Sequence, residues 1–300
     1  MFAELAGPWE AARQSTLRAA RGGERKRAEG AGRKPKLVFF DRLLVTLVHL
    51  RHQLPHEVLA ELFDVDRSTV SEAIRRLRPL LAARGFAVPD RPGLRLKTLE
   101  DVFAYAEAEG VEMRLDGPRP RSGAHRPGVP DAVSSSPASA GRTPSRPPRS
   151  VTARAACCCP AWVRPGRMHD QTAVRTEGIA EQFRNRPGVK AKVDSGYAGL
   201  AKEFPGQVSA PPKKPKDEAC DGDKYAWRET RRRQSSARIC VEHTNAELRQ
   251  WAPLRRFTGR RDIYAETHLA IASLVSDRSA QRVTRPETST ELVLVRDVTC

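Results

Sequence analysis

The spacing of apolar and polar positions predicts three helices between residues 37 and 83. In the first, apolar residues recur three and four positions apart and form one stripe, at Leu37, Phe40, Leu43, Leu44, Leu47, Val48 and Leu50. A second, short helix covers residues 55–63, because the missing N–H of Pro55 costs nothing at a helix start. A third helix begins near Asp66 or Ser68, after a short turn.

The third helix carries the first functional prediction. Thr69 and Glu72 are placed for a capping box at its start. Helix, short turn and helix, with polar and basic residues opening the second helix, is typical of a helix-turn-helix over residues 37–88. In that arrangement the second helix enters the major groove of DNA and presents Arg67, Ser68, Thr69, Ser71, Glu72 and Arg75. An ordinary three-helix packing module is the alternative.

The segments that flank this unit look different. Residues 1–36 are polar and rich in Arg, Lys and Gly, which predicts a flexible basic arm that follows phosphates or is simply solvated. Residues 84–97 read as a Pro/Gly/Arg linker. A helix over 98–109, capped by Thr98, is followed by alternating apolar positions that predict a half-buried strand ending at Asp116.

The composition then changes abruptly. Residues 118–162 contain no Leu, Ile, Phe, Tyr, Lys or Glu and many Pro, Ser, Ala and Arg, so this stretch is expected to be disordered. Beyond it the pattern predicts a helix, a strand, a short helix, a basic DNA-facing insertion and two further helices, at 170–184, 189–193, 198–204, 205–236, 237–249 and 264–282. The tail, 283–300, has no clear assignment.

Charge narrows the class of partner. The 300 residues include 53 Lys+Arg against 36 Asp+Glu, a net charge of +17. A surplus of this size predicts a polyanionic partner, most commonly nucleic acid, although a merely soluble basic protein is the alternative. No apolar run approaches the roughly 20 residues of a membrane span, and no signal peptide is evident, so we expect a cytoplasmic, nucleoid-associated protein. The six cysteines show neither a disulfide framework nor C-x-x-C metal spacing.

Three carboxylates suggest the chemistry. Asp116 and Asp194 each end a predicted strand, and Glu242 lies on a later predicted helix. Adjacent strands would bring the two aspartates together, and a helix across their ends would add the glutamate. Such a set can hold two divalent ions that act on a phosphodiester. Arg249 lies seven residues beyond Glu242 on the same helix face and could hold a phosphate.

Four strings occur in order after the helix-turn-helix: Leu115-Asp116-Gly117, Arg167-Met168-His169-Asp170-Gln171, Val193-Asp194-Ser195-Gly196-Tyr197 and Val241-Glu242-His243. Together with the helix-turn-helix, these four strings resemble bacterial insertion-sequence transposases of the DDE superfamily, most of all the insertion-sequence-five group.

The resemblance implies an α/β (α+β) fold in which an RNase H-like mixed sheet spans 95–282. It also implies catalytic and metal-binding roles for Asp116, Asp194 and Glu242, supported by His169 and Asp170. Mg²⁺ or Mn²⁺, two ions, would be the cofactor. The partners would be double-stranded DNA, both terminal inverted repeats and target DNA, bound by a homo-oligomer without any membrane contact.

The sequence departs from this family after Gly117. The family pattern would continue with Thr and two more core strands, whereas Pro118 follows here and the pattern resumes only at Val163. We interpret 118–162 as the product of two compensating frameshifts. A sheet without those strands would lose carboxylate geometry, so we expect impaired catalysis with DNA binding retained. A helix-turn-helix regulator without catalysis, and a disordered product without function, are the alternatives.

Overall fold

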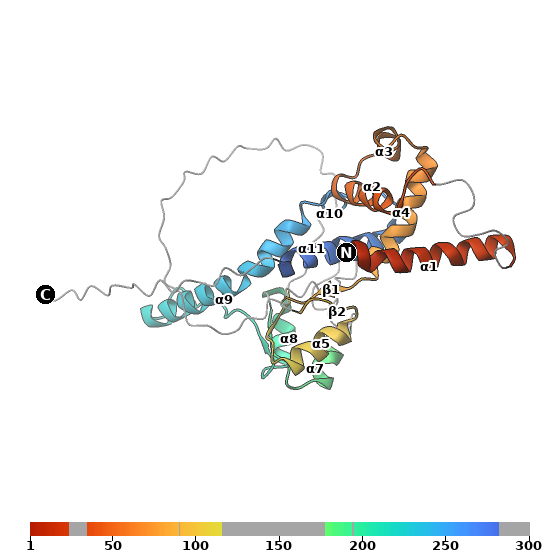
Figure 1. Cartoon of the computed structure of the whole chain (residues 1–300). Helices are drawn as coiled ribbons and strands as arrows, with labels where there is room; N and C mark the ends of the chain where they lie inside the picture. The colour runs from red at the N-terminus through yellow and green to blue at the C-terminus, as the bar shows by residue number, and fades with distance from the viewer. Residues whose placement is uncertain (24–34, 90, 116–177, 194, 282–300) are drawn as a thin grey trace, which may run out of the picture.

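The structure is a computed structural model that describes residues 1–23, 35–89, 91–115, 178–193 and 195–281. The side chains of Ser195 and of residues 234–242 lie outside this description, as do the predicted disordered segment and the tail. The described part folds around three apolar cores. Figure 1 shows how its helices and strands are arranged.

The first core holds the helix-turn-helix together. Helices α2 (Phe39–His52), α3 (His56–Leu62) and α4 (Arg67–Ala82) confirm the three predicted helices. Their apolar stripes meet in a small core of Leu37, Val45, Leu59, Ala60, Val70 and Ile74. The predicted capping box is wrong, because α4 begins after Asp66 and Thr69 already lies inside the helix, where it cannot be the cap.

The second core includes a helix that the sequence analysis missed. Residues 2–21, predicted as part of a flexible arm, form helix α1 (Phe2–Arg21). Leu5 is buried among α2, α4 and α11 (Tyr264–Gln281), and the Trp9 ring lies 5.1 Å from that of Phe39. These apolar side chains, four residues apart, anchor α1 to the second core.

A β-hairpin replaces the predicted linker. Strands β1 (Phe86–Ala87) and β2 (Arg95–Leu96) pair antiparallel. Phe86 belongs to the second core, whereas Leu96 belongs to the third, so the hairpin contacts both. The polar composition concealed this role, because only a few of its side chains are buried.

The third core surrounds a parallel sheet. Its strand order is β3 (Met113–Leu115), β4 (Ala191–Val193) and β5 (Val208–Ser209), all parallel. Helices α5 (Leu99–Ala108), α7 (Ile179–Asn185) and α8 (Ala198–Glu203) pack around it. The predicted Thr98 cap is confirmed, since its hydroxyl accepts from the Asp101 N–H at 3.1 Å.

The long helix α9 (Asp221–Leu248) connects the sheet region to the second core, where Leu248 is buried. Its first half extends away from the body (Figure 1). The predicted insertion at 205–236 is therefore wrong as a single unit, because it contains strand β5 and the first half of α9. Helix α10 (Ala252–Arg255) and two short 3-10 helices, Ser195–Tyr197 and Arg261–Ile263, complete the described elements.

The mixed helical and sheet content agrees with the predicted fold class. The predicted boundary between the helix-turn-helix and the rest does not separate two cores, because α11 packs against α4. The Ser273 hydroxyl donates to the Leu81 carbonyl at 3.0 Å, which ties the two helices together. Among the described residues, no helix combines the length and apolar character needed to cross a bilayer.

Candidate functional site

The predicted DNA-reading residues lie on the first turns of α4. Arg67 is exposed and pairs with Glu57 of α3 at 2.7 Å. Ser68 is exposed, and Thr69 is partly buried. The start of α4 therefore offers both a charged and a hydroxyl side chain to solvent, as a groove-facing helix requires.

Ser71 and Arg75 differ in how freely they can reach a partner. The Ser71 hydroxyl is hydrogen-bonded to Nδ1 of His56 at 2.8 Å, so it stabilises the contact between α3 and α4. Burial lowers the pKa of His56, and the nearby Arg67 lowers it further, which keeps this ring neutral near pH 7. Arg75 is 68% exposed and pairs with Glu72 at 2.6 Å.

The predicted catalytic residues lie largely outside the described part of the chain. Asp116 and Asp194 are not described, nor are His169 and Asp170, and the side chain of Glu242 is not described either. The backbone of α9 runs through position 242 as one helix, as predicted. The roles of these residues stay predictions.

The described strands that lead to the two aspartates are neighbours. Leu115 and Val193, which directly precede Asp116 and Asp194, are Cα partners in the parallel pair β3–β4. Both side chains are buried in the third core. The two strands thus reach the same edge of the sheet in register.

Near the end of α9, Glu247 is buried and pairs with Arg278 of α11 at 3.1 Å. Arg249 follows directly after the helix and is exposed. Exposure is compatible with the predicted phosphate contact, which remains a prediction. Within the described residues, no group of three His, Cys, Asp or Glu side chains is placed to hold a metal ion.

Comparison with known families agrees with this organisation. Residues 35–87 match the helix-turn-helix of DDE superfamily endonuclease, and residues 150–275 match the DDE superfamily endonuclease. The chain belongs to the DDE superfamily. No curated protein and no solved structure matches it.

The extent of the matches matters for the candidate site. Asp194 and Glu242 lie within the endonuclease match, whereas Asp116 lies before it. The match begins at residue 150, inside the stretch interpreted as frameshifted, and the frameshift remains a hypothesis. Helix α1 precedes both matched segments, and its arginines belong to the segment that was predicted as an arm that follows phosphates or is solvated.

Proposed function

We propose that this DDE-superfamily chain is a transposase that binds the ends of an insertion sequence of the insertion-sequence-five type. In this proposal the start of α4 reads DNA, and Asp116, Asp194 and Glu242 act in strand cleavage and strand transfer. The observation that supports it most directly is the in-register pairing of Leu115 with Val193, since the residue after each is a predicted catalytic aspartate.

DDE-superfamily endonucleases use divalent metal ions. The strand register fits such a site, because parallel neighbours that end together deliver the residues that follow them to one sheet edge. Carboxylate oxygens are the hard ligands that Mg²⁺ and Mn²⁺ prefer. Two such ions, when bound, would activate the attacking oxygen and stabilise the leaving one.

We further propose that catalysis in this copy is weak, with an RNase H-like sheet that is incomplete. Within the described residues, β3 has a strand neighbour only on the β4 side. A carboxylate at the end of an edge strand is held less rigidly than one at the end of a central strand. Misplacement of a reacting group by about 1 Å can cost roughly 10²-fold in rate.

Manganese binding separates this proposal from a regulator that only binds DNA. We expect Asp194→Ala and Glu242→Gln each to weaken Mn²⁺ binding, measured by titration calorimetry on the full chain. Asp217→Ala is the matched control, because Asp217 is an exposed carboxylate in the loop before α9. Equal Mn²⁺ affinity in the Asp194 variant and the wild type would contradict the proposed site.

Cleavage tests the second part of the proposal. With a plasmid that carries the element's own ends, we expect little Mg²⁺-dependent nicking by the wild-type chain. Rapid nicking that Asp194→Ala abolishes would show that the sheet edge is complete enough for catalysis. In that case the claim of weak catalysis would be wrong, whereas the transposase assignment would stand.

A further inference from the structure

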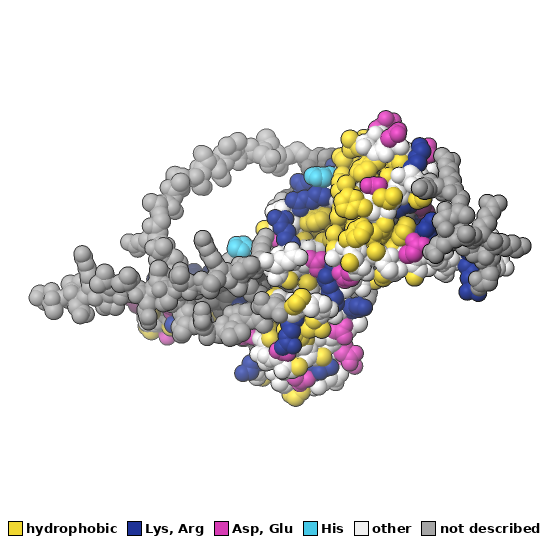
Figure 2. Space-filling view, viewed as in Figure 1, with side chains coloured by type: hydrophobic (Ala, Val, Ile, Leu, Met, Phe, Trp, Pro, Cys, Tyr) yellow, Lys and Arg dark blue, Asp and Glu magenta, His cyan; other side chains and the backbone are white. Residues whose placement is uncertain are grey.

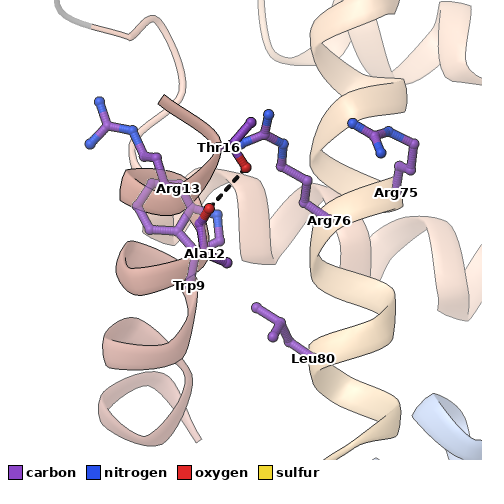
Figure 3. Close-up of a pocket in the computed structure, with 7 residues that line it drawn as sticks. All are labelled: Trp9, Ala12, Arg13, Thr16, Arg75, Arg76 and Leu80. Atoms are coloured by element: carbon purple, nitrogen blue, oxygen red, sulfur yellow. Dashed lines mark hydrogen bonds between the residues drawn. The ribbon is translucent and has the colours of Figure 1, made fainter. Parts of the chain in front are cut away.

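Helices α1 and α4 enclose a basic pocket beside the DNA-reading turns. The cavity is about 240 Å³ and is lined by Trp9, Arg13 and Thr16 of α1 and by Arg75, Arg76 and Leu80 of α4. Figure 3 shows Arg76 reaching from α4 toward α1, with Arg75 beside it on α4 and Arg13 next to Trp9 on α1.

The pocket brings together arginines that are far apart in the sequence. Burial lowers the pKa of Arg42 on α2, and the nearby positive charges of Arg76 and Arg13 lower it further. The charges of Arg13, Arg42 and Arg76, which come from three helices, therefore lie close enough to act on one another. Guanidinium groups bind phosphate oxygens through paired, charge-assisted hydrogen bonds.

The arginines of the pocket already form ion pairs with neighbouring carboxylates. Glu72 pairs with both Arg75 and Arg76, and Arg13 pairs with Glu10 at 3.2 Å. Burial raises the pKa of Glu72, but hydrogen bonds from both arginines outweigh it and hold the pKa below its ordinary value. The pairs are partly exposed, so an incoming phosphate can exchange with a carboxylate at small cost.

The position along α4 indicates which phosphate would bind. From Ser68 to Arg76 the helix rises roughly 12 Å, which is about the width of the DNA major groove. When the first turns of α4 enter the groove, Arg75 and Arg76 therefore reach its phosphate wall, and α1 lies next to them.

We propose that the α1–α4 pocket binds a backbone phosphate of the DNA duplex whose major groove α4 enters. This inference rests on the proposed DNA binding by α4 and extends it to α1, which lies outside the matched helix-turn-helix. Contacts of this kind position a protein on DNA without reading sequence, so they raise affinity for every duplex.

The sheet region supplies a matched control. Arg184 of α7 pairs with Glu203 and lies 5.9 Å over the Phe204 ring. Arg13 likewise pairs with Glu10 and lies 5.6 Å over the Trp9 ring. Substituting either arginine removes the same charge, ion pair and aromatic contact, and only one of them lines the pocket.

The experiment measures binding of the full chain to a fluorescent duplex of arbitrary sequence between about 50 and 200 mM salt. We expect Arg13→Gln and Arg76→Gln each to bind roughly tenfold more weakly. The slope of log affinity against log salt should fall by about one in each. Arg184→Gln should bind as the wild type does.

Glu72→Gln provides a change of opposite sign, because it frees both α4 arginines. We expect tighter binding by this variant, whereas Glu203→Gln should bind as the wild type does. This gain remains informative if Arg76→Gln proves to be unfolded by circular dichroism. Unchanged affinity and salt slope in folded Arg13→Gln would overturn the pocket proposal alone, and no salt-dependent DNA binding by the wild type would overturn the proposed function itself.

Discussion

Gly85 sits where the chain leaves α4 and enters the β-hairpin, and its backbone requires a glycine. Its φ is +75°, and a Cβ there would lie 2.6 Å from the Leu96 carbonyl oxygen. The contact is with backbone, so it cannot be relieved by rotating a side chain. Single residues of this kind set the geometry of an entire connection.

Gly85→Ala should therefore destabilise the protein, by about 1–3 kcal/mol. Gly206→Ala is the control, because an added Cβ there meets no atom within 4 Å and its φ is not positive. Urea unfolding of both variants beside the wild type measures the difference. Equal destabilisation by the two substitutions would contradict the steric argument.

His268 is buried on α11, and burial lowers its pKa to about 4. The unfolded chain takes up a proton near pH 6.5, whereas the folded chain does so only near the lower value. The free energy of unfolding is therefore unaffected by His268 above about pH 6.5. It falls by roughly 3 kcal/mol as the pH drops toward 4. Unfolding free energies measured across this range should show the loss, and His268→Gln should flatten it.

At the scale of elements, periodicity revealed those with a broad apolar stripe. It predicted α2, α4 and α11, because each buries several residues at helical spacing, whereas α3 was predicted from Pro55 at its start. It missed α1, in which only Leu5 is buried, and it missed the hairpin, whose strands are two residues long. Short elements are stabilised by tertiary contacts that a local pattern does not carry.

Part of the candidate site could also be predicted from the sequence, and part could not. The strand that ends at Leu115 was predicted from alternation, and its pairing with β4 agrees with the expected neighbourhood of the two aspartates. The α1–α4 pocket was not predicted, because it depends on how helices pack. Sequence spacing gives no distance between Arg13 and Arg76.

Helix α11 lies mostly in the segment matched to the endonuclease and packs against α4 of the matched helix-turn-helix. A substitution in its buried face should therefore change the stability of α4. Ile271→Ala, in the second core, should cost about 2–5 kcal/mol and weaken hydrogen-exchange protection in α4. Ile179→Ala, in the third core, should weaken the sheet region and leave α4 protected. Equal loss of protection in α4 from both variants would contradict the division into cores.

At the scale of the whole molecule, charge and apolar surface are distributed unevenly. Figure 2 shows exposed apolar side chains gathered on the face near α1 and α2, where Phe2, Val38 and Phe40 are about half exposed. Lys and Arg side chains flank this face (Figure 2). The predicted homo-oligomer stays a prediction, and this face is a place to look for its contact.

Arg84 fixes the hairpin to the helices around it. Its side chain is 2% exposed and pairs with Glu4 of α1 and Asp277 of α11, each at 2.7 Å. Burial alone would lower its pKa, but these two carboxylates outweigh burial and raise it, so the charge is permanent. The anchored hairpin has one strand in each neighbouring core.

The hairpin therefore joins the second and third cores through packed side chains. Packed residues of the hairpin connect α4 to the core around β3 and β4. If α4 binds DNA and the residues after β3 and β4 cleave it, as proposed, this connection predicts cuts at a constant number of base pairs from the bound sequence.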